Sequence, residues 1–362
     1  MENGLENVVA AETVLSDVDG RRGQLIVRGV SLDELRKRRF EAVAEMLFDG
    51  FFPAMPVGEA FAAALGAARG RVFPATGTID DAILQLSPVE AVRALMARLR
   101  DGDGLATAID LVAAPAVFAP ALIRRRRGEA PIAPDASLPH AADVLRMLRG
   151  APARTVEADA VNTYFVTVVD HGLNASTFAA RVVASTQAGL TSSVLAALSA
   201  LKGPLHGGAP GPVLDMLDAV GEPANAPIWI EATLNRGERL MGFGHRVYRV
   251  RDPRADALKA AVREMTAEGA IDPGRLKLAE AIEVAALAAL KRRKPDRVLD
   301  TNVEFYTALL LEALGFPREA FTAVFAMGRS AGWIAHAREQ AMGGRLIRPQ
   351  SVYVGPRPQQ AA

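Results

Sequence analysis

Two of the five histidines in this 362-residue sequence lie in turns framed by glycines. His206 is followed by Gly207 and Gly208, and His245 comes directly after Gly242-Phe243-Gly244. Glycine lets the backbone approach a ligand closely and adopt conformations that other residues resist. Each histidine by itself is more typical of a residue that only stabilises a turn. The two together indicate a site.

The sequence after His206 predicts the protonation state of its imidazole. Pro210 and Pro212 precede an apolar run that begins at Val213, and proline just inside such a run marks a helix start. His206 is therefore expected ahead of a helix N-terminus, where the helix dipole disfavours the imidazolium. A neutral imidazole there can donate a hydrogen bond to a developing oxyanion.

Basic residues follow the second histidine. Arg249 is one of them, and Asp252-Pro253 then forms an N-cap and N1 pair that places Arg254 in the first turn of a helix. Histidines and arginines around glycine turns predict a site for a small anion with a reactive carbonyl group.

Composition excludes several classes of function. The net charge is +1, with 42 basic and 41 acidic residues, so no bulk field favours nucleic acid or an anionic membrane. The absence of cysteine excludes disulfides and thiolate catalysis. No apolar run is expected to approach the roughly 18 residues that span a bilayer, and the N-terminus lacks a signal-peptide pattern. A cytoplasmic protein is the expectation.

The hydrophobic pattern predicts a mainly helical chain. Residues 23–30 are the best strand candidate, bounded by glycines. Helical periodicity begins at Phe40, and proline-broken helices continue to about Phe316. Residues 176–201 form one expected helical stretch rich in small side chains.

Seven sequence blocks, taken together, resemble the citrate synthase family, in family order and over nearly the whole chain. They are residues 168–178, 203–208, 242–248, 252–254, 301–307, 325–333 and 348–355. One block departs from the usual family form: Glu304 stands for aspartate, Thr301 for proline and Thr307-Ala308 for serine-glycine.

The resemblance implies an all-α fold with a short N-terminal β-hairpin. It implies a large discontinuous domain of residues 1–207 and 317–362, with a smaller helical domain of residues 208–316 inserted. It also implies a cytoplasmic homodimer and an acyltransferase of the tricarboxylic acid cycle. Such an enzyme condenses acetyl-coenzyme A (acetyl-CoA) with oxaloacetate and hydrolyses citryl-CoA to citrate and CoA. No nucleic acid, membrane, metal or permanently bound cofactor is expected, and the CoA thioester is a co-substrate.

The resemblance also assigns roles to individual residues. Glu304 is the expected base, His206 the donor to the enolate oxygen, and His245 the group that polarises the ketone. The expected oxaloacetate ligands are His171, Arg254, Arg329 and, from the partner subunit, Arg348. The residues expected at the coenzyme are Leu240, Met241, Gly242, Phe243, Gly244 and Arg249.

Two other functions remain open on sequence grounds. A 2-methylcitrate synthase would use propionyl-CoA, and one methylene changes binding by only about 1–3 kcal/mol. A weakly active, ligand-binding regulatory protein would explain the altered block around Glu304. Arg69 is either a further ligand contact or, by preference, an exposed helix-end residue. His140 and His336 are expected to be packing, interface or exposed residues.

Overall fold

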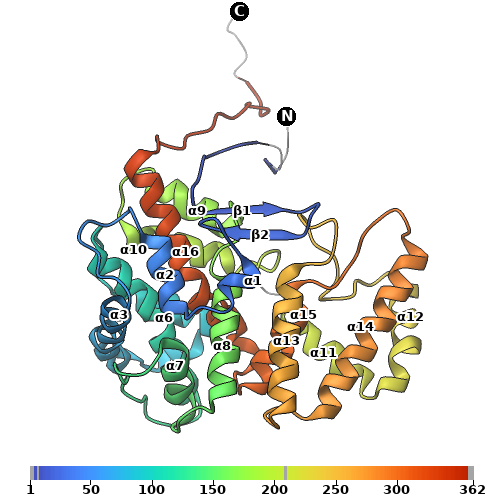
Figure 1. Ribbon diagram of the computed structural model, residues 1–362. Helices are drawn as coiled ribbons and strands as arrows, with labels where there is room; N and C mark the ends of the chain where they lie inside the picture. The colour runs from blue at the N-terminus through green and yellow to red at the C-terminus, as the bar shows by residue number, and fades with distance from the viewer. Residues whose placement is uncertain (1–3, 6–7, 208–209, 358–362) are drawn as a thin grey trace, which may run out of the picture.

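The computed structural model describes residues 4–5, 8–207 and 210–357 and is mainly helical, as predicted (Figure 1). Gly208 and Ala209, which follow His206, lie outside the described residues. The strands are β1 (Ser16–Asp19), β2 (Gln24–Val27) and β3 (Val30–Ser31), and they form an antiparallel sheet in the order β1-β2-β3. The predicted N-terminal hairpin is therefore confirmed.

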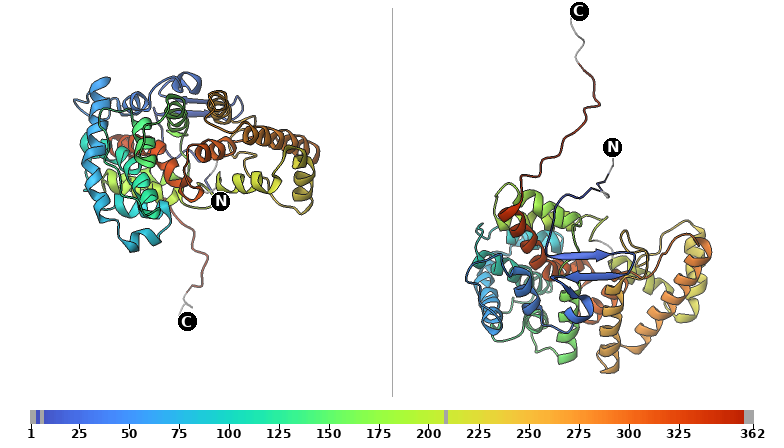
Figure 2. Two further views of the ribbon diagram at one scale, coloured as in Figure 1. Left: turned by 90° about the horizontal axis from the view of Figure 1, so that it is seen from below. Right: turned by 45° about the horizontal axis from the view of Figure 1, so that its top comes forward.

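One group of helices packs around the long C-terminal helix α16, which contacts α2, α5, α6, α8, α9 and α10. Its members are α1 (Leu32–Leu35), α2 (Phe40–Phe48), α3 (Glu59–Val72), α4 (Asp81–Gln85), α5 (Pro88–Met96), α6 (Leu105–Arg126), α7 (His140–Arg149), α8 (Thr155–Val168), α9 (Ala175–Ala184), α10 (Leu190–Leu201) and α16 (Phe321–Gly343). The residues after α16 run as an extended tail away from the helices (Figure 2).

A second group of helices lies to one side of the first (Figure 1). Its members are α11 (Pro210–Val220), α12 (Ala226–Asn235), α13 (Pro253–Ala267), α14 (Pro273–Arg293) and α15 (Val303–Ala313). Three short 3-10 helices complete the described elements: η1 (Phe73–Thr78), η2 (Pro223–Asn225) and η3 (Arg318–Ala320). Helix α13 packs on α8 and so joins the two groups. The division into domains at residues 208 and 316 stays a prediction.

Helix α6 corrects one expectation from the sequence. It is long and apolar enough to cross a membrane by length and composition alone, although its apolar run contains Asp110 and two prolines. Most of that stretch is buried against other helices, with α3, α5, α7 and α16 around it. Its apolar character is therefore that of a core helix.

The small-residue stretch 176–201 is also not one helix. Helix α9 ends at Ala184, and α10 begins at Leu190. Between them Gln187 and Gly189 have φ angles of 62° and 95°, which an α-helix cannot contain. The two helices then pack against each other, an approach that small side chains permit.

Arg69 is neither a ligand contact nor an exposed helix end. Its side chain is 1% exposed, and its Nε lies 2.8 Å from the Asp143 carboxylate. Its Nη2 donates to the carbonyls of both Asp135 and Leu138. Arg69 therefore holds the loop before α7 to α3. A buried cation persists in a core only when it is paired in this way.

The hairpin touches both groups of helices. Ser16 Oγ accepts the N–H of Gly172 at 3.0 Å, and the Gly20 carbonyl accepts the N–H of Arg249 at 2.7 Å. A Cβ at Gly20 would lie 2.2 Å from the Val247 carbonyl oxygen. The hairpin turn is therefore in close backbone contact with the loop that follows His245.

Gly20→Ala is expected to destabilise the protein, because neither backbone segment can give way as a flexible side chain would. The expected loss in free energy of unfolding is about 1–3 kcal/mol, as for other overpacked sites. Urea unfolding measures it. Gly70→Ala is the control, since a Cβ there meets nothing within 4 Å in helix α3. Equal stability of the two variants would contradict the close contact.

Candidate active site

The side chains of His171, His245, Tyr248 and Arg254 form one cluster, in which three residues of the segment 245–254 meet His171 from a distant part of the sequence. The rings of His171 and His245 lie 5.5 Å apart, and the ring of Tyr248 lies 5.5 Å from His171 and 4.7 Å from His245. His171 Nε2 is 3.1 Å from the Tyr248 hydroxyl. Arg254 approaches His245 Nε2 with its Nη2 at 3.1 Å. The structure therefore brings together three of the predicted site residues and adds Tyr248.

The loop after His245 fixes the position of the proton on its ring. The backbone N–H groups of Val247 and Tyr248 both point at His245 Nδ1, at 3.0 and 3.1 Å. Because an N–H can only donate, Nδ1 is the acceptor nitrogen of the neutral ring. The proton of the neutral ring is therefore on Nε2. Burial and the charge of Arg254 lower the pKa of His245 to about 4, so the ring is neutral at pH 7.

Asp252 orients Arg254. As predicted, Asp252 is the N-cap of α13 and accepts the Arg254 N–H at 3.0 Å. Its two oxygens also accept bonds from Arg254 Nε and Nη2, at 3.0 and 2.8 Å. Both side chains are almost fully buried. This bidentate pair holds the guanidinium at the start of the helix.

Arg329 is a buried cation of a different kind. It lies on α16, is 2% exposed, and its Nε donates to the Val168 carbonyl. Its guanidinium also stacks over the ring of Phe325, with 4.8 Å from its Cζ to the ring centroid. No ion pair joins it to a carboxylate within the described residues, and burial lowers its pKa to about 10. A buried guanidinium without a carboxylate is suited to bind an anion.

His206 is connected to α16 by hydrogen bonds through Ser176 and Trp333. The Ser176 N–H points at His206 Nε2 at 3.3 Å, and the Ser176 hydroxyl lies 2.8 Å from the same atom. Trp333 Nε1 donates to that hydroxyl at 3.1 Å. Because the Ser176 N–H can only donate, Nε2 is an acceptor and the ring proton is on Nδ1.

Burial and the charge of Arg329 lower the pKa of His206 to about 4. His206 is therefore a neutral imidazole, as predicted. The expected helix also follows it, since α11 begins at Pro210. Nδ1 makes no hydrogen bond to any described residue, so it is available to donate.

Glu304 stands in the first turn of α15. Asn302 caps this helix and accepts the Glu304 N–H at 3.1 Å. The Glu304 carboxylate accepts no hydrogen bond from the described part of the chain. Burial raises the pKa of Glu304 to about 7, against the opposing charges of Arg254 and Arg329. A carboxylate with this pKa can take a proton and return it near neutral pH.

The positive charge of Arg329 acts on three of the predicted site residues. Its charge lowers the pKa of His171, His206 and Glu304, so all three lie within its Coulombic range. His171 also feels the charges of Arg254 and His245. The charge of Arg329 therefore reaches His171, His206 and Glu304, and the charge of Arg254 reaches His171, His245 and Glu304.

The segment predicted to line a coenzyme is bound to the base of the Glu304 turn. Gly242 and Gly244 have φ angles of 84° and 83°, which favour glycine. The Gly242 carbonyl accepts the Asn302 N–H, and the Gly244 carbonyl accepts from the Asn302 side chain, each at 2.9 Å. Of the remaining predicted residues here, Leu240 is buried, Met241 and Phe243 are partly exposed and Arg249 is exposed.

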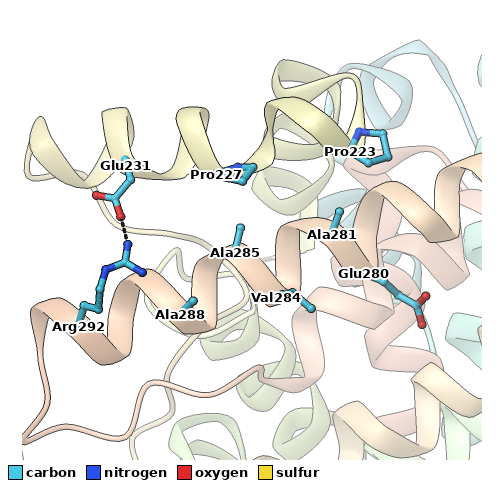
Figure 3. Close-up of a pocket in the computed structure, with 9 residues that line it drawn as sticks. All are labelled: Pro223, Pro227, Glu231, Glu280, Ala281, Val284, Ala285, Ala288 and Arg292. Atoms are coloured by element: carbon cyan, nitrogen blue, oxygen red, sulfur yellow. Dashed lines mark hydrogen bonds and ion pairs between the residues drawn. The ribbon is translucent and has the colours of Figure 1, made fainter.

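Two hollows lie in the second group of helices. One, of about 200 Å³, has Met241, Trp229 and Arg239 in its lining, so it borders the predicted coenzyme segment. The other, of about 520 Å³, lies between α12 and α14 and is lined mainly by small apolar residues. Figure 3 shows the ion pair of Glu231 and Arg292 at one end of it.

The remaining predicted residues lie apart from the cluster. Arg348 is exposed on the tail after α16, and no hydrogen bond or ion pair joins it to the cluster in the part of the chain that the structure describes. His140 is buried and stacks on Phe40, and His336 is buried 3.2 Å from Asp170. The block around His171 could also be read as an Asp170–His171 pair, but the structure pairs Asp170 with His336 instead.

Sequence reasoning missed several residues that hold the site. Ser176, Tyr248 and Trp333 have no role assigned from the sequence, although each lies in one of the blocks that resemble the family, residues 168–178, 242–248 and 325–333. Asp252 was read only as a helix cap. Its acidic side chain two residues before Arg254 was a signal for the ion pair as well.

A neutral hydrogen-bond donor, a carboxylate base and buried arginines define a site for acid–base chemistry on an anionic carbonyl compound. A family model described as "Citrate synthase, C-terminal domain" matches residues 4–350. The chain belongs to the citrate synthase family, and it is accordingly an acyltransferase.

Relatives and solved structures agree with this family. The putative citrate synthase 2 of Mycobacterium tuberculosis is 38% identical over 98% of this chain and 93% of that protein. The 2-methylcitrate synthase of the same species is 35% identical over 98% and 91%. Citrate synthase from Thermotoga maritima superposes with a TM-score of 0.85 at 31% identity, covering 100% of this chain and 98% of that one. Citrate synthase from Thermoplasma acidophilum, solved with carboxymethyl-CoA and oxaloacetate, gives 0.83 at 28% identity, covering 99% and 97%.

The pH dependence of kcat/KM is expected to follow Glu304. The carboxylate is protonated below its pKa of about 7, so activity is low in acid and rises as the pH passes through about 7. His206 and His245, with pKa values of about 4, stay neutral from pH 5 to 9. The rate of thiol release from acetyl-CoA, measured over this range, checks the profile. A rate that is constant down to pH 5 would contradict it.

Proposed function

We propose that this chain condenses acetyl-CoA with oxaloacetate and hydrolyses citryl-CoA to citrate and CoA. The observation that carries the proposal is the arrangement of three groups: Glu304 with its raised pKa and neutral His206 both feel the charge of Arg329, and neutral His245 lies beside Arg254, whose charge also acts on Glu304. Enolisation of a thioester requires a base and an oxyanion donor at the same time. This site supplies both.

Each group has one role in the condensation. The Glu304 carboxylate removes a proton from the methyl carbon of the thioester, while His206 Nδ1–H donates to the thioester oxygen as it becomes an enolate. The enolate carbon then attacks the ketone carbon of oxaloacetate. His245 Nε2–H donates to the ketone oxygen and gives it a proton as the alkoxide forms. The proton that Glu304 removed from the methyl carbon balances this loss, so that at the end of the step His245 is again neutral and Glu304 is again a carboxylate. Water then cleaves the thioester and releases CoA.

Arginines would neutralise the two carboxylates of oxaloacetate. Arg329 is buried without a carboxylate partner in the described residues, and Arg254 lies beside His245. In the free protein Arg254 Nη2 faces His245 Nε2, so two donors meet. A substrate carboxylate that takes up this Nη2 would free His245 Nε2–H for the ketone. The third guanidinium would be Arg348 of a second copy, because the tail carries it away from its own chain.

The segment 240–244 and Arg249 would contact the coenzyme, next to the Glu304 turn. The CoA thioester would be a co-substrate and not a resident cofactor. The complex of the Thermoplasma acidophilum enzyme with carboxymethyl-CoA and oxaloacetate supports this assignment. We place the protein in the cytoplasm as a homodimer.

Propionyl-CoA is the alternative acyl donor. The likeness to a 2-methylcitrate synthase favours testing it, whereas no described contact selects between the two acyl chains. Turnover with acetyl-CoA and propionyl-CoA, compared as kcat/KM, separates the two activities. A regulatory protein would bind oxaloacetate and release no thiol with either donor.

The division into two domains at residues 208 and 316 suggests closure over the substrates. Closure would exclude water while the enolate exists. Small-angle scattering with oxaloacetate and carboxymethyl-CoA tests this part of the proposal. An unchanged radius of gyration would count against it.

Glu304→Gln is expected to lose nearly all activity, because an amide of the same shape cannot accept the methyl proton. Glu304→Asp is expected to retain some, reduced by up to about 100-fold because its carboxylate is displaced by about 1 Å. The measurement is thiol release with both substrates present. Activity of Glu304→Gln near that of the wild type would refute the assignment of the base.

The thermal stability of Glu304→Gln gives a second test of the raised pKa of Glu304. The pKa of Glu304 in the folded protein is raised to about 7 from its ordinary value of 4.5, so the protonated form favours folding, and this contribution is lost as the pH rises through 7. Glu304→Gln is therefore expected to unfold at a higher temperature than wild type at pH 8, with a much smaller difference at pH 5.

Arg348 has its own test. Arg348→Ala and Glu304→Gln are each expected to be inactive as pure proteins. Mixed dimers would contain one site with both native residues, so random re-pairing restores up to about a quarter of wild-type activity. No recovery after mixing, or full activity of Arg348→Ala alone, would contradict a shared site.

A further inference from the structure

A buried carboxylate that the proposed chemistry does not use lies behind the start of α15. Glu283, on α14, is 3% exposed. Its Oε1 accepts from Thr301 Oγ1 at 2.7 Å and Arg251 Nη2 at 2.8 Å. Its Oε2 accepts from Lys259 Nζ at 2.6 Å and the Tyr306 hydroxyl at 2.7 Å. Every donor here is a side chain, so Glu283 joins α13, α14 and α15 in one polar centre.

Two of these donors stand on either side of Glu304 in the sequence. Thr301 comes three residues before it, and Tyr306 two residues after it. Both hydroxyls end on the same buried carboxylate. The backbone turn that carries Glu304 is therefore held at both ends by Glu283.

Thr301 is also one of the positions at which this chain departs from the usual family form. A proline there would restrict φ to about −65° by its ring. Threonine has no such ring, but its hydroxyl is bonded to Glu283 and its N–H donates to Asp300 Oδ1 at 2.7 Å. The side chain is 1% exposed. At this position the hydrogen bond from the Thr301 hydroxyl to Glu283 restrains the backbone, as the ring of a proline would.

The Glu283 carboxylate is ionised and fully partnered. Burial acts to raise its pKa, but the hydrogen bonds from Lys259, Tyr306 and Thr301 and the charge of Arg251 lower it to about 2. Arg251 and Lys259 balance its charge. Arg251 also pairs with Asp300 at 3.2 Å, one residue before Thr301. A buried polar network that is satisfied in this way is rigid.

We propose that Glu283 is a positioning residue that sets the place of the Glu304 carboxylate by holding Thr301 and Tyr306. The base of this chain is one methylene longer than the usual aspartate. The hydrogen bonds of Thr301 and Tyr306 to Glu283 hold the turn that carries this base. This inference rests on the proposed function, since it takes Glu304 as the base.

The test removes one hydroxyl at a time and keeps the side-chain shape. Thr301→Val and Tyr306→Phe are each expected to lower kcat, by up to about 100-fold if the carboxylate moves by about 1 Å. The KM for oxaloacetate is expected to be unchanged, because the residues that would bind it are untouched. Thr301→Ser keeps the hydroxyl and is expected to restore the rate.

Thr266→Val is the matched control. Thr266 lies on α13, the helix of Lys259, and its hydroxyl bonds only to the Val262 carbonyl of its own helix. It is expected to have wild-type kcat and KM. Thermal unfolding of each variant reports on folding separately from the rate.

A wild-type kcat in Thr301→Val would overturn the proposal. So would an equal fall in kcat for Thr301→Ser, because the hydroxyl would then not be the cause. If Thr301→Val does not fold, Tyr306→Phe decides in the same way.

A double variant separates this inference from the proposed function. If Thr301 acts only through Glu304, Thr301→Val causes no further loss in the Glu304→Gln background. A further loss there would refute positioning through the base. No thiol release by the wild type with either acyl donor would refute the proposed function itself, whereas wild-type activity in Glu304→Gln would refute only the assignment of the base.

Discussion

The carboxylate of Asp252 is the interaction on which the site depends. It caps α13, holds the Arg254 guanidinium with both oxygens, and accepts the Val303 N–H at 3.1 Å. One buried side chain thus joins the start of α13 to the start of α15. Removal of one partner from such a buried pair is strongly destabilising. The orientation of Arg254 and the position of the Glu304 turn cannot vary independently.

Burial then determines the chemistry of each titrating group. Desolvation favours the neutral form of every group in the site, so His206 and His245 lose their protons and Glu304 holds its own near neutral pH. The fixed arginines oppose this for Glu304 and reinforce it for the histidines. A neutral imidazole donor and a carboxylate that takes up and releases a proton near pH 7 therefore coexist in the site.

Local signals in the sequence predicted the parts of the fold that depend on neighbouring residues. Asp252-Pro253 predicted a helix start with Arg254 in its first turn, and residues 23–30 contained a strand. The convergence of His206, His245 and Glu304 came only from family resemblance, because no local rule brings residues this distant together. Glu283 was missed for the same reason: its partners Thr301 and Tyr306 are about 20 residues away, and nothing in its own helix marks it.

Packing partners that are remote in sequence account for the other errors. From the sequence, Arg69 is typical of an exposed residue at a helix end. It can be buried because the Asp143 carboxylate of α7, far away in the sequence, pairs with its guanidinium. Residues 176–201 are uniformly helical in type, and the break at Gln187 accompanies the packing of α9 against α10. The role proposed for Arg348 in the site of a second subunit stays a prediction, because it is a property of an assembly, which one chain does not contain.

The long apolar helix α6 has a consequence for synthesis of the protein. One of its faces is covered by α16, which begins at Phe321, whereas α6 ends at Arg126. A ribosome adding about 5–20 residues per second needs roughly ten to forty seconds to make the intervening chain. During that interval the nascent polypeptide presents a membrane-like segment without its cover. Asp110 and the two prolines within the helix make insertion into a lipid bilayer, or pairing with another apolar segment, less favourable until α16 arrives.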